Sequence, residues 1–396
     1  MSLNDTPSSE RVHIGFFGMR NAGKSSLVNR VTGQELSVVS EVKGTTTDPV
    51  RKAMELLPLG PVVIIDTPGL DDTGYLGEKR VAQTRKILDM IDIAVLVKEA
   101  GNDLFAEETE LINIFREKDV PYIIACNKSD LGLDNKLTGD NVITVSAATG
   151  ENIHELKEML AAFGKKTVTE DHLVSDLLRK GEMVILVVPI DESAPKGRLI
   201  LPQQQVMRDI LDAGCFFATC QPSELQATLD SLKNPPQLVI TDSQAFGEVS
   251  KIVPEDVDLT SFSILMARYK GDLRQLTEGA RKLADLKDGD KVLIAEGCTH
   301  HRQCNDIGTV KLPNLIRKYS GAEPEFSFVS GGDFPEDISG YDLIVHCGAC
   351  MLNNKAMKHR LDVAKNAGTP IVNYGVAIAQ MKGILDRSLQ RFLSSM

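Results

Sequence analysis

The chain has 396 residues, which is too long for one ordinary domain, so we expect two or three domains. Apolar residues make up 42% and charged residues 25%, and the formal net charge of −11 argues against a broad nucleic-acid-binding surface. No apolar run approaches the roughly 18 residues of a membrane span, and the polar N-terminus lacks a signal-peptide core, so we expect a cytoplasmic protein with no membrane or nucleic-acid partner.

Short apolar runs alternate with amphipathic stretches along the chain, which is the pattern of parallel sheets covered by helices. The first predicted domain covers residues 1–166. Its expected strands are Val12–Phe17, Val62–Asp66, Ile93–Val97, Tyr122–Cys126 and Val142–Val145. A helix at Ile153–Phe163 follows, and Gly164–Thr169 is the predicted linker to the next domain.

The second predicted domain covers residues 167–260, and the third covers residues 261–396. The second is expected to contain a helix including Leu173–Leu178, the strand Met183–Val188, the polar loop Pro189–Arg198, the helix Gln203–Ala213, and strands near Cys215–Thr219 and Gln237–Ile240. In the third, the clearest strands are Lys291–Ala295, Tyr341–Val345 and Pro370–Val372. The predicted fold class is therefore α/β, with three domains and mostly parallel sheets.

The first strand leads into Gly18–Ser25, which fits G-x-x-x-x-G-K-S and precedes an apolar helical stretch. Glycines let successive backbone N–H groups face a phosphate, Lys24 can reach the β- and γ-phosphates, and the Ser25 hydroxyl can ligate Mg²⁺. This pattern predicts a P-loop fold for the first domain. The expected phosphate-binding residues are Gly18, Asn21, Ala22, Gly23, Lys24, Ser25 and Ser26.

A second nucleotide motif, Asp66-Thr67-Pro68-Gly69, ends an apolar strand. Asp66 can hold Mg²⁺ through water, and the Gly69 N–H can meet the γ-phosphate. Thr46 lies in the first long loop, where it can sense Mg²⁺ and the γ-phosphate. The expected catalytic residues are Lys24, Thr46, Asp66 and Gly69.

Two further motifs predict selectivity for guanine. Asp130, in Asn127-Lys128-Ser129-Asp130, can accept hydrogen bonds from guanine N1–H and from the exocyclic amine, and adenine cannot supply that pair. Ser146 and Ala147 follow another strand and can present a backbone N–H to guanine O6. A lone P-loop match can be a chance glycine-rich turn, whereas four motifs in order indicate a GTPase.

With these motifs, the first 165 residues resemble the TrmE–Era type of GTPase. Asn21 stands where potassium-dependent members carry an Asn that helps to bind K⁺, and Gly44–Asp48 is similar to their switch I loop. Leu70 stands where Ras-like proteins carry a water-positioning Gln. Glu78 is a candidate for that role, although a solvated helix residue is the more ordinary interpretation. The resemblance implies slow GTP hydrolysis, stimulated by K⁺ over Na⁺.

Cysteine and histidine gather in the last quarter of the chain, each group just past a predicted strand. Cys298-Thr299-His300 follows one strand and His346-Cys347-Gly348-Ala349-Cys350 follows another, so both motifs are expected at one sheet edge. The spacing of Cys347 and Cys350 lets two thiolates meet one metal centre. A predicted helix at Leu352–Ala367 would place Cys350 near a positive helix end.

Three interpretations of these residues compete. They are buried cysteines beside hydrogen-bonded core histidines, a Cys₃His zinc site, or an iron–sulfur site on Cys298, Cys347 and Cys350. The spacing alone does not choose among them. Cys304 is expected to be a thiol outside the site, and Cys126, Cys215 and Cys220 are expected to pack in cores or interfaces.

The C-x-H and H-C-x-x-C motifs, downstream of a TrmE–Era-type GTPase, resemble the HydF family of [FeFe]-hydrogenase maturation GTPases. The resemblance covers a GTPase domain, a dimerisation domain and a cluster domain. It implies a homodimer with a [4Fe–4S] cluster on Cys298, Cys347 and Cys350, which carries the diiron subcluster precursor to the hydrogenase HydA. The other implied partners are the radical-SAM maturases HydE and HydG. One iron of the cluster then has no cysteine, and His300, His346 and Asp191 are candidates for its fourth ligand. The histidines could equally hydrogen-bond the cluster or the incoming precursor.

Three functions follow from these observations. The first is a metallocluster scaffold with a GTPase switch, which uses GTP, Mg²⁺, K⁺ and a [4Fe–4S] cluster. The second is a ribosome- or tRNA-associated GTPase with an added zinc module, against which the acidic charge counts. The third is a redox or metal sensor whose cluster gates GTP hydrolysis.

Overall fold

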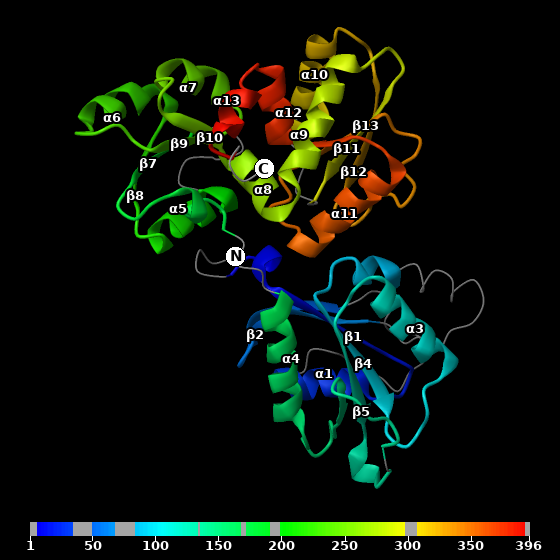
Figure 1. Cartoon of the computed structure of the whole chain (residues 1–396). Helices are drawn as coiled ribbons and strands as arrows, with labels where there is room; N and C mark the ends of the chain where they lie inside the picture. The colour runs from blue at the N-terminus through cyan, green and yellow to red at the C-terminus, as the bar shows by residue number, and fades with distance from the viewer. Residues whose placement is uncertain are drawn as a thin grey trace. The chain divides into compact units, whose positions relative to one another are not determined.

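The computed structural model describes residues 6–34, 50–67, 84–133, 135–167, 172–190, 199–297 and 307–392. The chain divides into two compact units, Met1–Glu170 and Asp171–Met396, shown in Figure 1. In both units the described sheets are parallel apart from one edge strand, so the predicted α/β class is confirmed. No helix within the described ranges is both long and apolar enough to cross a bilayer.

The first unit is built around one sheet with the strand order β2-β3-β1-β4-β5-β6. Its elements are η1 (Ser8–Glu10), β1 (Val12–Gly18), α1 (Lys24–Thr32), β2 (Val50–Leu56), β3 (Gly60–Asp66), β4 (Ile93–Glu99), α3 (Ala106–Glu117), β5 (Tyr122–Asn127), η2 (Ser129–Leu131), β6 (Val142–Thr144) and α4 (Ile153–Thr167). Only β2 runs antiparallel to its neighbour. Strand β2 was not predicted because Arg51, Lys52 and Glu55 interrupt its apolar residues.

The alternation of side chains along the strands divides this core into two layers. Ile14 and Phe16 of β1 point to one face, where they pack with α1 and α4. Phe17 points to the other face, where it packs with α3 and stacks against Phe115. Since both faces are covered, the parallel strands are apolar throughout, which is why they were predictable from sequence.

The second unit contains two four-stranded parallel sheets, with the orders β10-β9-β7-β8 and β12-β11-β13-β14. The elements up to residue 270 are η3 (Ser175–Leu177), β7 (Met183–Val187), α5 (Leu201–Asp212), β8 (Phe216–Cys220), η4 (Pro222–Glu224), α6 (Leu225–Ser231), β9 (Leu238–Thr241), α7 (Phe246–Ile252), β10 (Asp258–Ser261) and α8 (Phe262–Lys270). The predicted boundary at residue 260 falls inside β10, which pairs with β9.

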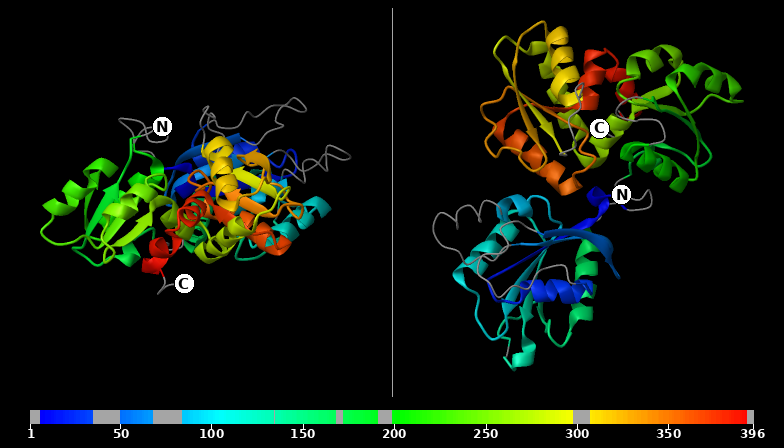
Figure 2. Two further views of the ribbon diagram at one scale, coloured as in Figure 1. Left: turned by 90° about the horizontal axis from the view of Figure 1, so that it is seen from above. Right: turned by 180° about the vertical axis from the view of Figure 1, so that it is seen from behind.

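The second sheet of this unit is formed by later elements. They are α9 (Leu273–Arg281), η5 (Lys282–Asp285), β11 (Lys291–Glu296), η6 (Ile307–Lys311), α10 (Leu312–Ser320), β12 (Glu325–Ser330), β13 (Leu343–His346), α11 (Asn354–Ala367), β14 (Ile371–Asn373), α12 (Tyr374–Met381), α13 (Leu385–Leu389) and η7 (Gln390–Phe392). Figures 1 and 2 show α8, α9, α12 and α13 between the two sheets, and one continuous hydrophobic core includes residues from both.

Close contacts hold the second unit together, both within its second sheet and between its two halves. A Cβ atom on Gly279 of α9 would lie 2.0 Å from the carbonyl oxygen of Ile371 in β14, so only glycine allows this helix to pack so near the strand. At the end of the chain, Arg391 Nη1 donates to Asp258 Oδ2 of β10 at 3.1 Å. The last described residues therefore pack against the first sheet of the unit.

The predicted helix including Leu173–Leu178 is wrong. Only the short 3-10 helix η3 forms there, because a side chain and not a helical carbonyl satisfies the backbone. The N–H groups of Val174 and Ser175 both donate to Asp209 Oδ2 of α5, each at 2.7 Å.

Candidate functional site

The P-loop connects β1 to α1 in the first unit, as predicted. Gly23 is the N-cap of α1 in a left-handed conformation with φ 83°, and it has no side chain that could cap the helix. A Cβ atom on Gly23 would lie 2.3 Å from Asn127 Nδ2. No side chain caps the start of α1, so its backbone N–H groups can bind a phosphate. Glycine is required at position 23 because its φ angle is positive and because a Cβ atom would clash with Asn127.

Ser25, Lys24 and Asp66 form the charged centre of this site. Ser25 Oγ donates to Asp66 Oδ2 at 3.0 Å, and Lys24 Nζ lies 3.6 Å from Asp66 Oδ1. Asp66 is 9% exposed, and its Oδ1 is buried with no hydrogen-bond partner among the described residues. A buried carboxylate oxygen in this position beside a hydroxyl fits the oxygen ligands that Mg²⁺ prefers.

Asn127 joins the P-loop to the predicted guanine site. Its Nδ2 donates to the carbonyl oxygen of Ala22 at 3.0 Å, and its Oδ1 accepts from the N–H of Ala147 at 3.0 Å. The side chain is 1% exposed, so these bonds are shielded from water. Asn127 therefore fixes the phosphate loop and the Ser146–Ala147 loop relative to each other.

Asp130 and Lys128 lie beside this connection. Ser146 Oγ donates to Asp130 Oδ1 at 2.6 Å, which holds the carboxylate predicted to read guanine. Lys128 has φ 69° and donates from Nζ to Glu99 Oε2 at 3.1 Å. These pairs lie 16 and 29 positions apart in the chain, and sequence reasoning gave no role to Glu99.

The remaining predicted residues of the first unit divide into two groups. Asn21 is exposed in a left-handed conformation with φ 63°, Gly18 ends β1, and Ser26 lies in the first turn of α1. Thr46, Gly69, Leu70 and Glu78 lie outside the described residues, so the predictions for the switch loops stay predictions.

In the second unit, the strand ends that precede the two cysteine motifs are neighbours. Strands β11 and β13 are adjacent and parallel, with Ala295 opposite His346. Beyond them, the N–H of Gly297 donates to Cys347 Sγ at 3.0 Å. Cys298 is the next residue in the sequence. The strand ends that precede the two motifs thus lie at one sheet edge, where backbone N–H groups face the sulfur of Cys347.

The segment Cys347–Leu352, called the cysteine loop below, turns through a left-handed residue, Ala349, with φ 54°. The N–H of Ala349 also donates to Cys347 Sγ, at 3.4 Å. Helix α11 begins at Asn354 behind an Asn353 cap, two residues later than predicted. Cys350 therefore lies before the cap and is farther from the positive end of α11 than predicted.

His346 is the last residue of β13 and is fully buried. Its Nδ1 bonds with the Cys347 carbonyl oxygen at 2.8 Å, and its Nε2 bonds with Arg360 Nη1 at 2.7 Å. Burial, and then the charge of Arg360, lower the pKa of His346 to about 3, against the opposing effect of the Cys347 carbonyl. A neutral imidazole with both nitrogens bonded favours a core role, and the structure does not support the predicted ligand role.

The other residues predicted for the metal site, Asp191, Cys298 and His300, lie outside the described residues, as does Cys304. Within the described ranges, no group of three or more His, Cys, Asp or Glu side chains is placed to hold a metal ion. Cys126, Cys215 and Cys220 are buried, as expected of core cysteines.

Sequence reasoning missed two buried cations beside the cysteine loop. Lys270, at the end of α8, is 1% exposed, and Arg360 of α11 is 5% exposed. Burial lowers the pKa of Arg360, while the nearby Cys347 thiol group raises it. Nothing local in the sequence separates these residues from the solvated Lys and Arg of other helices. Buried positive charge suits a site for an anionic cluster held by thiolates.

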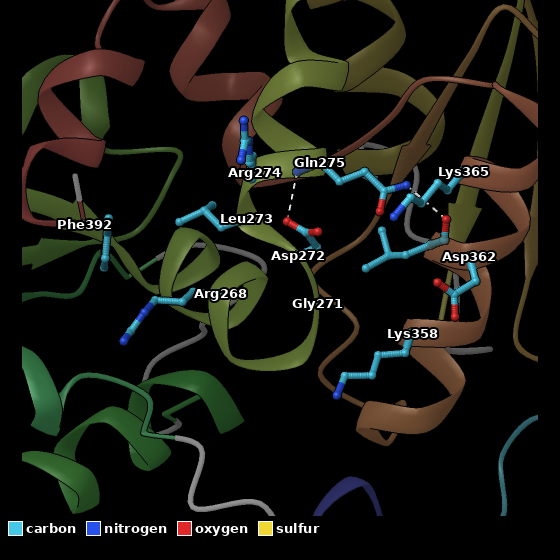
Figure 3. A pocket seen from close by; sticks show the side chains of 11 residues that line it. Arg268, Gly271, Asp272, Leu273, Arg274, Gln275, Lys358, Asp362, Lys365 and Phe392 are labelled. Carbon is cyan, nitrogen blue, oxygen red and sulfur yellow. Dashed lines mark hydrogen bonds between the residues drawn. The ribbon is translucent and has the colours of Figure 1, made fainter. Parts of the chain in front are cut away.

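A cavity of about 540 Å³ lies near the start of α9 in the second unit, as Figure 3 shows. Arg268, Arg274, Lys358 and Lys365 contribute basic groups to its lining. Arg268 also stacks over the Phe392 ring at 5.7 Å. None of the predicted site residues lines this cavity.

Comparison with protein families divides the chain into three matched segments. Residues 13–128 match the 50S ribosome-binding GTPase family, residues 173–271 the hydrogen maturase F dimerization domain, and residues 274–391 the hydrogen maturase F tetramerization domain. The two hydrogen maturase F segments together span more than half of the chain.

Individual relatives among characterised proteins are GTPases that match part of the chain. The tRNA modification GTPase MnmE of Lactobacillus acidophilus is 37% identical over 150 residues, which cover 36% of this chain and 32% of that protein. GTPase Der of Clostridium acetobutylicum is 27% identical over 189 residues, covering 42% of this chain and 43% of that protein. The match thus spans about a third of the length of the MnmE relatives.

Among solved structures, Era from Aquifex aeolicus bound to GDP and AlF₄⁻ has 16% identity and a TM-score of 0.33, with coverage of 53% of this chain and 93% of that chain. The family assignment does not depend on this likeness. The two hydrogen maturase F segments follow a domain with the P-loop, Asp66 and Asn127–Asp130 in one site. The chain belongs to the hydrogen maturase F (HydF) family, and its N-terminal domain is a P-loop GTPase domain of the TrmE–Era type.

Proposed function

We propose that this chain is a GTP-hydrolysing scaffold that binds a [4Fe–4S] cluster and delivers the diiron subcluster precursor to apo-[FeFe]-hydrogenase. One observation carries the proposal: the Gly297 N–H lies 3.0 Å from Cys347 Sγ, which joins the strand ends of both cysteine motifs in a hydrogen maturase F chain. Cys298, Cys347 and Cys350 are the proposed ligands. Asp191 and His300 remain candidates for the fourth position.

The nucleotide site has the groups that GTP requires. Ser25 and Asp66 would hold Mg²⁺, which screens phosphate charge when bound. Lys24 supplies a cation beside Asp66, and Asn127 fixes the position of the P-loop relative to the base site. Thr46 and Gly69 are the proposed switch residues that respond to the γ-phosphate. GTP hydrolysis would then change the ordering of these loops and, through it, affinity for a partner.

Activation of apo-hydrogenase tests the function. Purified protein, loaded in the presence of the radical-SAM maturases HydE and HydG, is expected to confer hydrogen evolution on apo-HydA. Reaction mixtures lacking this chain are the control. Cluster binding without activation would favour a redox or metal sensor, and bound zinc with no iron would favour a GTPase with a zinc module.

The proposed site of action is the cytoplasm, where thiols stay reduced.

Potassium is expected to raise the rate of GTP hydrolysis several-fold over sodium at equal ionic strength. The reason is Asn21, whose exposed side chain stands in the P-loop where a monovalent cation can add positive charge beside the phosphates. Phosphate release measured in KCl and NaCl checks this. The Asn21→Ala variant should lose the difference, and equal rates in the two salts for the unaltered protein would contradict it.

The dimerization-domain match supports oligomerisation, and we place the contact of a homodimer at β8. This strand is an edge of its sheet and carries Phe216, which is 61% exposed. Unpaired backbone groups and an exposed aromatic ring suit pairing with a second copy. Phe216→Lys is expected to halve the mass measured by light scattering, whereas Leu57→Lys, at another exposed apolar residue, should not. A Phe216→Lys protein of unchanged mass would exclude this contact.

A further inference from the structure

Lys270 is a buried lysine whose ammonium group faces the cysteine loop. Its Nζ donates to the carbonyl oxygens of Ala349 at 3.0 Å, Cys350 at 3.3 Å and Leu352 at 2.6 Å. The residue is 1% exposed at the end of α8. An ammonium group has three protons, so these three carbonyl groups can occupy all of them.

The loop conformation explains why such a residue is useful there. Ala349 is in the left-handed region, which is unfavourable for a residue with a Cβ atom. Its carbonyl oxygen accepts from the N–H of Leu352 at 3.0 Å as well as from Lys270. Hydrogen bonds from a charged donor are stronger than neutral ones, so Lys270 offsets the cost of this turn.

A second cation holds the loop at its start. Arg360 bonds with His346 Nε2 at 2.7 Å and with the carbonyl oxygen of Gly331, while His346 Nδ1 bonds with the Cys347 carbonyl. The cysteine loop is thus fixed by α11 at one end and by α8 at the other. Carbonyl oxygens, however, repay only part of the cost of burying an ammonium group, so a nearby anion would stabilise it further.

We propose that Lys270 is the positioning residue of the cysteine loop and supplies the buried countercharge for the cluster bound there. This inference rests on the proposed cluster site. Lys270 belongs to the segment matched by the dimerization domain, and the cysteine loop belongs to the segment matched by the tetramerization domain. The loop that carries Cys347 and Cys350 is therefore held by an element of the preceding domain.

The positioning role is tested on the cluster-free protein by hydrogen–deuterium exchange. Lys270→Met keeps a long side chain but removes the charge and all three donors, so amides of residues 348–353 should exchange about tenfold faster or more. Lys270→Arg should restore much of the protection. Lys358→Met, the same change at an exposed lysine of α11, is the matched control. Unchanged exchange in a folded Lys270→Met protein would overturn the positioning role.

The countercharge role is tested on protein reconstituted with iron and sulfide. Removing a buried positive charge disfavours addition of an electron, so the midpoint potential of Lys270→Met should be more negative than that of the unaltered protein and of Lys358→Met. Iron should also pass faster to a chelator. An unchanged potential would overturn this half of the proposal. If the unaltered protein binds no iron, the proposed function fails, while the exchange result still decides the positioning role.

Lysine labelling tests the burial of Lys270 on the unaltered protein, so its result does not depend on whether a variant folds. With acetic anhydride under native conditions, Lys270 should react far more slowly than Lys358, because only Lys270 is buried among carbonyl acceptors. Equal labelling of the two lysines would show that Lys270 is not held behind the loop, and would overturn the proposal.

Discussion

Changing Cys347 to Ser is expected to abolish cluster binding, with iron content near zero and no activation of apo-hydrogenase. Cys347 Sγ accepts hydrogen bonds from the N–H groups of Gly297 and Ala349, so the sulfur lies where backbone dipoles stabilise negative charge. A serine hydroxyl is a hard, weakly acidic ligand that does not replace a thiolate on iron. The measurements are iron and sulfide content and the visible spectrum after anaerobic reconstitution.

Cys220→Ser is the matched control for this loss. Cys220 lies buried in β8, and burial raises the pKa of its thiol, so it is expected to remain an inert thiol. The same loss is expected for Cys350→Ser and Cys298→Ser, whereas Cys304→Ser should retain iron. Full iron content and full hydrogenase activation in all three ligand variants would overturn the cluster proposal.

Changing Asp130 to Asn is expected to weaken GTP binding by about 10²-fold or more, because two hydrogen bonds to a charged acceptor are lost. Ser146 Oγ holds the Asp130 carboxylate at 2.6 Å, so the acceptor is fixed before the base arrives. Xanthine carries an oxygen where guanine carries its exocyclic amine, and an Asn amide can donate to that oxygen. The variant should therefore bind xanthosine triphosphate more tightly than GTP.

Titration with a fluorescent analogue of each nucleotide measures this exchange of specificity. Asp140→Asn, which removes the same charge from an exposed position in the same unit, should leave GTP affinity unchanged. Undiminished GTP affinity in Asp130→Asn would mean that the guanine edge is read by other residues, and that the role proposed for the Asn127–Asp130 segment is incorrect.

Local features made much of the fold predictable. Strands buried on both faces, such as β1 and β4, read as continuous apolar runs, and they were found to within two residues. The nucleotide-binding motifs were equally easy to recognise in the sequence, because each lies at the end of such a strand. The failures had two different causes. The edge strand β2 pairs with the next strand, β3, but lacks a buried apolar run, and the expected helix near Leu173 gave way to bonds with Asp209, which lies far along the chain.

The sequence by itself determined the GTPase motifs, the two cysteine motifs and their expected meeting at one sheet edge. Those inferences depend on short-range order: residue type, spacing and position after a strand. Only the tertiary structure decided which groups surround the sites. Lys270 reaches carbonyl groups about eighty residues away, and Arg360 occupies a nitrogen of His346 that would otherwise be a candidate ligand. A buried lysine and a solvated one look alike in sequence, because burial is a property of the packed elements and not of the residue.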